Sequence, residues 1–250
     1  MNEPALLLLA RAADPAVETL RQLQPQRLRH VDVADLSSAG WRYVVGCPEL
    51  ASACAGGQVL AAGEIAAVLC RIVAVVPQDL EHLHSEDRAF AAAEMNAFLR
   101  AWLAQFAGRR CNEPNSTSLA GPAWHAMRWR WLALRLGVPA VAASFAMPDP
   151  ASSDLDAGSD PDGVTVVVIG DQVIGRTAPT LEGYSLRIAR EVRSSLLALR
   201  FVWDREWRFE SADSSPQLDS PRAAKLFEWA FAAPADQSKD LRSAASAVAQ

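Results

Sequence analysis

Arginine side chains gather on two predicted helices that flank a segment rich in proline and aspartate. The set consists of Arg128, Arg130, Arg135, Arg187, Arg190 and Arg193. Arg190 and Arg193 are three positions apart, so they share one helix face. A planar guanidinium binds a carboxylate or phosphate through paired hydrogen bonds. If the helices converge, Arg128, Arg190 and Arg193 could bind an anionic cofactor; a solvated basic face is the simpler interpretation.

Histidines suggest little further chemistry. His82 and His84 lie two apart beside Glu81, which offers nitrogen and oxygen ligands to zinc. No third ligand stands at a typical spacing, so we predict a polar loop there. His125 lies on a mainly apolar stripe and is expected to be a hydrogen-bonded core residue. No phosphate-binding loop, dinucleotide fingerprint or nucleophile elbow occurs.

The composition excludes some functions. The 250 residues are half hydrophobic and carry a net charge of -5, which argues against a nucleic-acid partner. Of the 24 basic residues, only Lys225 and Lys239 are lysines, so chemistry that needs a lysine before position 225 is excluded. Cys47, Cys54 and the other two cysteines form no CxxC pair, which favours reduced, buried thiols. The apolar run 6–10 is too short for a signal sequence or a membrane span, and we predict a cytoplasmic protein.

Alternating strand and helix patterns predict an α/β fold with a parallel sheet in the first half of the chain. Predicted strands cover 5–10, 31–33, 41–45, 58–61, 65–76 and 109–112. Asp14 and Pro15 begin a predicted helix over 15–24, and Ser85 is the predicted cap of a helix that ends near Gly108.

The second half of the chain predicts two hairpins and three helices. The helix from Pro122 has two apolar stripes, which indicates burial between two layers. Residues 164–169 and 172–176 flank Gly170-Asp171, a two-residue hairpin turn. A second hairpin turns at 204–206, and helices follow each hairpin, the last over 221–231.

The order of these motifs resembles that of ATP-grasp ligases with a Rossmann-like pre-ATP-grasp domain. The likeness spans about residues 65–216 and rests on short motifs. They are Arg71, Glu94, Asn112-x-Pro114, Leu119-Ala120-Gly121-Pro122, Gly137-Val138-Pro139, Val164–Arg176 and Ser211–Pro216. The resemblance implies ATP and Mg²⁺ as cofactors and carboxylate–amine ligation as the activity.

Two departures put that activity in doubt. The family's glycine-rich strand subdomain, whose lysines hold phosphates, would need about 25–30 residues before any turns, more than 141–163 provide. The family's metal-binding motif, Glu-x-Asn, is also replaced. Ser211 stands at the glutamate position and Asp213 at the asparagine position. Asp204 could stand for the upstream carboxylate and share a metal with Asp213; two solvated turn carboxylates are the alternative.

The resemblance implies a division of the chain into five parts. Residues 1–115 would be a pre-ATP-grasp-like α/β domain and 116–146 a connecting helix and segment. A flexible linker over 147–163 would lead to 164–232, a reduced α+β remnant of the ATP-grasp C-terminal subdomain. Residues 233–250 would be a disordered tail.

Three hypotheses for function follow. The first is a non-catalytic ATP-grasp-like protein, without a cofactor, that binds a peptide, carrier or enzyme partner in a biosynthetic or protein-modification complex. The second is an ATP-dependent carboxylate–amine ligase whose partner completes the ATP clamp. The third is an ordinary α/β small-molecule binder. No membrane partner is expected; a homodimer stays open because Trp41, Trp207 and Trp229 have no predicted burial.

Overall fold

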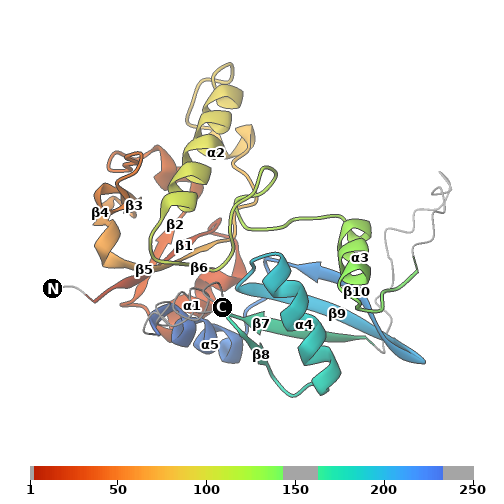
Figure 1. Cartoon of the computed structure of the whole chain (residues 1–250). Coiled ribbons are helices and arrows are strands. Elements are labelled where there is room, and N and C mark those ends of the chain that lie inside the picture. Colours follow the sequence, from red (N-terminus) through yellow and green to blue (C-terminus); the bar gives the residue numbers. More distant parts are fainter. Residues whose placement is uncertain (1–2, 143–162, 233–250) are drawn as a thin grey trace, which may run out of the picture.

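The computed structural model describes residues 3–142 and 163–232. A four-stranded parallel sheet and a four-stranded antiparallel sheet lie next to each other, with helices packed against both (Figure 1). A small hairpin of β3 (Ser52–Ala55) and β4 (Gln58–Ala61) forms a separate two-stranded sheet. The predicted linker 147–163, except Gly163, and the predicted tail 233–250 lie outside the described residues.

The parallel sheet has the strand order β2-β1-β5-β6. Its strands are β1 (Ala5–Leu9), β2 (Leu28–Val31), β5 (Ile65–Cys70) and β6 (Arg109–Arg110). Leu6 to Leu9 are all fully buried, as expected for a continuous apolar run in a central parallel strand covered on both faces. The predicted α/β class with a parallel sheet is therefore confirmed.

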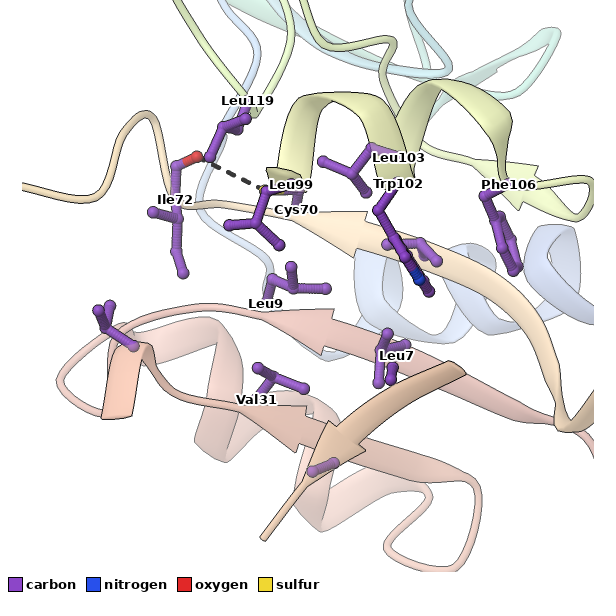
Figure 2. Close-up of a cluster of buried hydrophobic side chains, with 14 of the residues drawn as sticks. Leu7, Leu9, Val31, Cys70, Ile72, Leu99, Trp102, Leu103, Phe106 and Leu119 are labelled. Carbon is purple, nitrogen blue, oxygen red and sulfur yellow. Dashed lines mark hydrogen bonds between the residues drawn. The ribbon is translucent and has the colours of Figure 1, made fainter. Parts of the chain in front are cut away.

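Helices cover both faces of this sheet. On one face α2 (Arg88–Gln105) packs Leu99, Trp102 and Leu103 against the strands, as Figure 2 shows. On the other face lie α1 (Pro15–Leu23) and α5 (Ser220–Phe231). The Asp14 carboxylate accepts a hydrogen bond of 2.9 Å from the backbone N–H of Ala16, so the predicted start of α1 is confirmed.

The antiparallel sheet has the order β10-β9-β7-β8. Its strands are β7 (Val164–Ile169), β8 (Gln172–Ile174), β9 (Leu196–Asp204) and β10 (Glu206–Asp213). Gly170 begins the first turn at a φ of +65°, and Arg205 forms the second at +60°. Both predicted hairpins are confirmed, because their turn residues adopt left-handed backbone conformations that reverse the chain tightly.

The two faces of the antiparallel sheet have different partners. One face packs against α3 (Ala126–Arg135) and α4 (Pro179–Glu191). The other face contributes Val167 and Ile169 to the core that also contains β1, α1 and α5. The two sheets therefore share one hydrophobic cluster, with α5 packed against both.

Several local predictions are wrong. The helix predicted to begin at Pro122 begins only at Ala126. Residues 41–45 form no strand and make only an isolated bridge between Arg42 and Ser52. The helix α2 begins after Asp87 rather than at Ser85. The helix α3 is not buried on two sides, because Trp131 is 58% exposed. His125 is an exposed residue at the α3 N-terminus, where its Nδ1 accepts from the Met127 N–H at 3.4 Å.

The three tryptophans without predicted burial all have partners inside the chain. Trp41 donates to the Asp35 carbonyl at 3.0 Å and lies edge-on to Trp102. Trp207 and Trp229 are half-buried against the cores of the antiparallel sheet and of α5. A homodimer stays a prediction. None of the helices in the described parts of the chain combines the length and apolarity needed to cross a bilayer.

The cysteines should differ sharply in reactivity. Cys54, Cys70 and Cys111 are buried and Cys47 is partly exposed, all as free thiols. Burial raises the pKa of Cys70 to about 12 and raises that of Cys111 as well, so neither supplies thiolate near neutral pH. We expect iodoacetamide to label Cys47 alone in the native protein and all four thiols after denaturation, counted by mass spectrometry. Native labelling of Cys70 would contradict this packing.

Candidate functional site

The structure does not bring Asp204 and Asp213 together. Asp204 is paired with Glu206 at the turn between β9 and β10, whereas Asp213 lies opposite Ala198 at the far end of the hairpin. At about 3.3 Å per residue their backbones are roughly 20 Å apart, too far for both side chains to bind one ion. Across residues 3–142 and 163–232, no cluster of three or more His, Cys, Asp or Glu side chains is arranged to hold a metal.

Asp213 has a local structural role. Its Oδ1 accepts a hydrogen bond of 2.8 Å from the backbone N–H of Ser215, the pattern of an Asx turn. A pocket of about 390 Å³ lies beside it on the open part of the sheet, lined by Arg200, Ser211 and Arg222 among others. The carboxylate therefore stabilises the bend that follows β10 and borders a small polar hollow.

Arg71 joins the two sheets at this bend. It follows β5, and its guanidinium donates to the Asp14 carboxylate at 2.7 Å. It also donates to the carbonyls of Pro216 and Ser215 at 2.9 and 3.2 Å. The side chain is only 8% exposed. The rigid fork of donors thus connects the carboxyl ends of β1 and β5 to the segment after β10.

Asn112 makes a second connection from the end of β6. Its Nδ2 donates to the carbonyls of Ala120 and Ser214, at 3.1 and 2.9 Å, and its Oδ1 accepts from the Leu196 N–H at 3.1 Å. Gly121 adopts a φ of +97°, and a Cβ there would lie 2.6 Å from the Asn112 Cβ. The motifs that carry the resemblance, Arg71, Asn112-x-Pro114 and Ser211–Pro216, therefore meet in space as structural joints.

The predicted arginine site is divided. Arg190 and Arg193 line one pocket of about 400 Å³, and Arg128 does not line it. Arg128 instead lies over the Trp124 ring, 3.9 Å from its centroid. Arg190 and Arg193 thus line the same pocket although α4 ends at Glu191, so they do not share a helix face as predicted.

The pocket has a third arginine that the sequence did not indicate. It is lined by Gly108, Arg110, Glu113, Gly170, Asp171, Leu186, Ala189, Arg190, Arg193, Ser194 and Ser195, and we call it the basic pocket. Arg110 lies on β6, far along the chain from α4. Glu113 lies between two of the arginines, 3.7 Å from Arg110 and 3.8 Å from Arg193. Three guanidinium groups and two carboxylates therefore surround one hollow.

Similarity to known proteins is found among solved structures and not at the level of sequence. No protein-family model matches the sequence, and no curated protein gives a significant match. Macrocyclase MdnC bound with precursor peptide MdnA, from Microcystis aeruginosa MRC, is 12% identical with a TM-score of 0.66; the match covers 90% of this chain and 99% of that one.

Two further solved structures agree with it. ATP-grasp ligase PsnB complexed with minimal precursor is 13% identical with a TM-score of 0.64, covering 92% of this chain and 99% of that one. A Chryseobacterium gregarium RiPP-associated ATP-grasp ligase in complex with ADP and a leader and core peptide is 10% identical with a TM-score of 0.60, covering 90% and 96%. At such identities the likeness concerns the fold. The chain therefore has an ATP-grasp ligase-like fold, in a shortened form of 250 residues.

Proposed function

We propose that this protein is a non-catalytic ATP-grasp-like protein that binds a peptide in a biosynthetic or protein-modification complex. MdnC, PsnB and the Chryseobacterium gregarium ligase are each described in complex with a precursor, or with leader and core peptides. The same fold can thus bind peptides. A carrier or enzyme partner would fit the same role, and we place it in the cytoplasm because its four cysteines are free.

The observation that carries the non-catalytic part is the use of Asp213. In the resemblance this position would hold Mg²⁺, yet its carboxylate accepts from the Ser215 N–H inside its own turn. Arg71 places a guanidinium against the neighbouring carbonyls. With no lysine before Lys225 to hold phosphates, we propose that residues 1–115 keep a pre-ATP-grasp role and that 164–232 are a remnant without an ATP clamp.

One feature favours the alternative, an ATP-dependent carboxylate–amine ligase completed by a partner. The pocket beside Asp213 also contains Arg200, Ser211 and Arg222, which suit an anion near a carboxylate. In that case ATP and Mg²⁺ would be the cofactors. The residues present supply cations and a single carboxylate there, so any metal would need ligands from the nucleotide or the partner.

Isothermal titration with ATP and Mg²⁺, repeated with ADP, tests the choice. We expect no binding with a Kd tighter than ~1 mM, because no lysine precedes Lys225 and the described residues offer no paired metal ligands. Heat with one-to-one stoichiometry that disappears in Asp213→Ala would make the ligase the better conclusion. In parallel, short peptides of acidic, basic and neutral composition should be titrated; failure of every class to bind would contradict the peptide-binding proposal.

A further inference from the structure

Among the residues that the structure describes, one arginine of the basic pocket has no partner. Within residues 3–142 and 163–232, the Arg190 guanidinium makes no hydrogen bond or ion pair. Arg110, by contrast, uses Nη1 to donate to the carbonyls of Leu103, Ala104 and Phe106 at 2.8, 2.6 and 3.2 Å. Arg110 is therefore held in place by α2, while Arg190 remains available for a ligand.

Arg193 is held in an unfavourable backbone conformation. It follows α4 with a φ of +51°, and the Ser194 N–H donates back to the Ala189 carbonyl at 2.9 Å. This is the helix-ending position that glycine normally takes, because a side chain there is strained. Strained residues of this kind concentrate at binding sites. An arginine at such a position places a cation on the rim of the pocket.

The next residue adds an unsatisfied polar group. Ser194 is only 5% exposed, and its hydroxyl has no hydrogen-bond partner among the residues the structure describes. Buried hydroxyls are usually paired, so each exception calls for an explanation. A small shift of this side chain toward a bound acceptor would supply the missing hydrogen bond.

Charge points to an acidic ligand. Three arginines face Glu113 and Asp171 in the basic pocket, an excess of positive charge in a chain whose net charge is -5. Both contacts of Glu113, at 3.7 and 3.8 Å, are longer than a hydrogen bond. A ligand carboxylate can therefore bind Arg190 and Arg193 with shorter, charge-assisted bonds without breaking a strong internal pair.

The basic pocket adjoins a second, larger pocket. A second pocket of about 570 Å³ shares Gly170, Asp171 and Ser195 with the basic pocket and includes Arg109 and Trp229. The Arg109 guanidinium lies over the Trp229 ring, 5.5 Å from its centroid. The second pocket is also lined by Asp171 and by Lys225 paired with Glu228. Together the two hollows give an extended path with charged and aromatic walls, which suits a peptide rather than a small ion.

We propose that the basic pocket binds an acidic side chain of a peptide partner, with Arg190 and Arg193 as the carboxylate-binding residues and the adjoining hollow taking the neighbouring chain. This inference rests on the proposed peptide-binding function and names the surface and the class of peptide. It assigns the pocket a role separate from the hollow beside Asp213.

Fluorescence anisotropy of the full chain with labelled hexaglutamate tests the proposal. Arg190→Gln and Arg193→Gly should each weaken binding about tenfold, the loss of roughly one charge-assisted hydrogen bond. Added salt should weaken binding further. Arg176→Gln, which removes an exposed arginine outside the basic pocket, is the matched control and should bind like the parent.

Arg193→Gly separates binding from folding. Glycine relieves the left-handed strain, so its Tm should stay within about 2 °C of the parent or exceed it. Unchanged hexaglutamate affinity in both variants would overturn the assignment of the basic pocket as the binding site. It would leave the proposed peptide binding intact. Equal binding of hexalysine, or displacement of the peptide by low millimolar inorganic phosphate, would also overturn it. Failure of all peptide classes to bind would overturn the proposed function with it.

Discussion

Replacing Asn112 with alanine is expected to lower the free energy of unfolding by about 3–4 kcal/mol. The variant leaves the buried Leu196 N–H without an acceptor and the carbonyls of Ala120 and Ser214 without a donor. A buried group left unpaired costs about 1–3 kcal/mol, and the N–H costs more than a carbonyl with a second lone pair. For a chain of this length the Tm should fall by roughly 10 °C, measured by thermal and urea denaturation.

The control for this prediction is Asn115→Ala. Within the described parts of the chain, the Asn115 side chain bonds only inside its own loop, to Thr117, Ser118 and Gly121. Its loss should cost no more than about 1–2 kcal/mol, since these bonds join no distant elements and water can replace the exposed ones. Equal losses for the two variants would show that Asn112 does not connect the sheets. A loss below about 1 kcal/mol for Asn112→Ala would show that water or a backbone shift replaces its three bonds.

Replacing Arg71 with methionine is expected to lower stability by about 2–4 kcal/mol. Breaking a buried ion pair by removing one partner costs about 3–5 kcal/mol, and we reduce this because the Asp14 side chain is 17% exposed. The carbonyls of Ser215 and Pro216 lose their donor as well. Urea denaturation measures the loss, and faster hydrogen exchange at Ser215 and Gln217 would locate it.

Two further variants, Arg71→Lys and Arg11→Met, serve as comparisons. Arg71→Lys keeps the charge beside Asp14 but cannot span three acceptors, so it should recover about half of the lost stability. Arg11→Met breaks the Arg11–Asp79 pair, whose arginine side chain is 44% exposed, and should cost about 1 kcal/mol or less. An Arg71→Met protein no less stable than Arg11→Met would contradict the role of Arg71 as a joint.

Elements with strong local signals were predictable. The four consecutive leucines of β1 required burial on both sides, and Asp14-Pro15 could begin a helix without help from the rest of the chain. The turn at Gly170 follows from a glycine between two apolar strands. The turn at Arg205 follows from the alternating aromatic residues on either side of it. Some local signals also failed, since α2 begins after Asp87 and not at Ser85, and other failures depended on packing. Whether Trp131 is covered depends on a second layer over α3, and hydrophobicity along the helix carries no information about that layer.

The candidate site likewise combines features that follow from the sequence with features that depend on packing. The sequence by itself determined the buried parallel strand, the hairpins and the lack of lysine before position 225. Only the tertiary structure decided that Arg110 joins those arginines, that Asp204 and Asp213 lie apart, and that Arg71 and Asn112 connect the sheets. The physical reason is range: capping, turn formation and periodicity act within a few residues, whereas these contacts join strand ends whose proximity exists only after both sheets pack against α5.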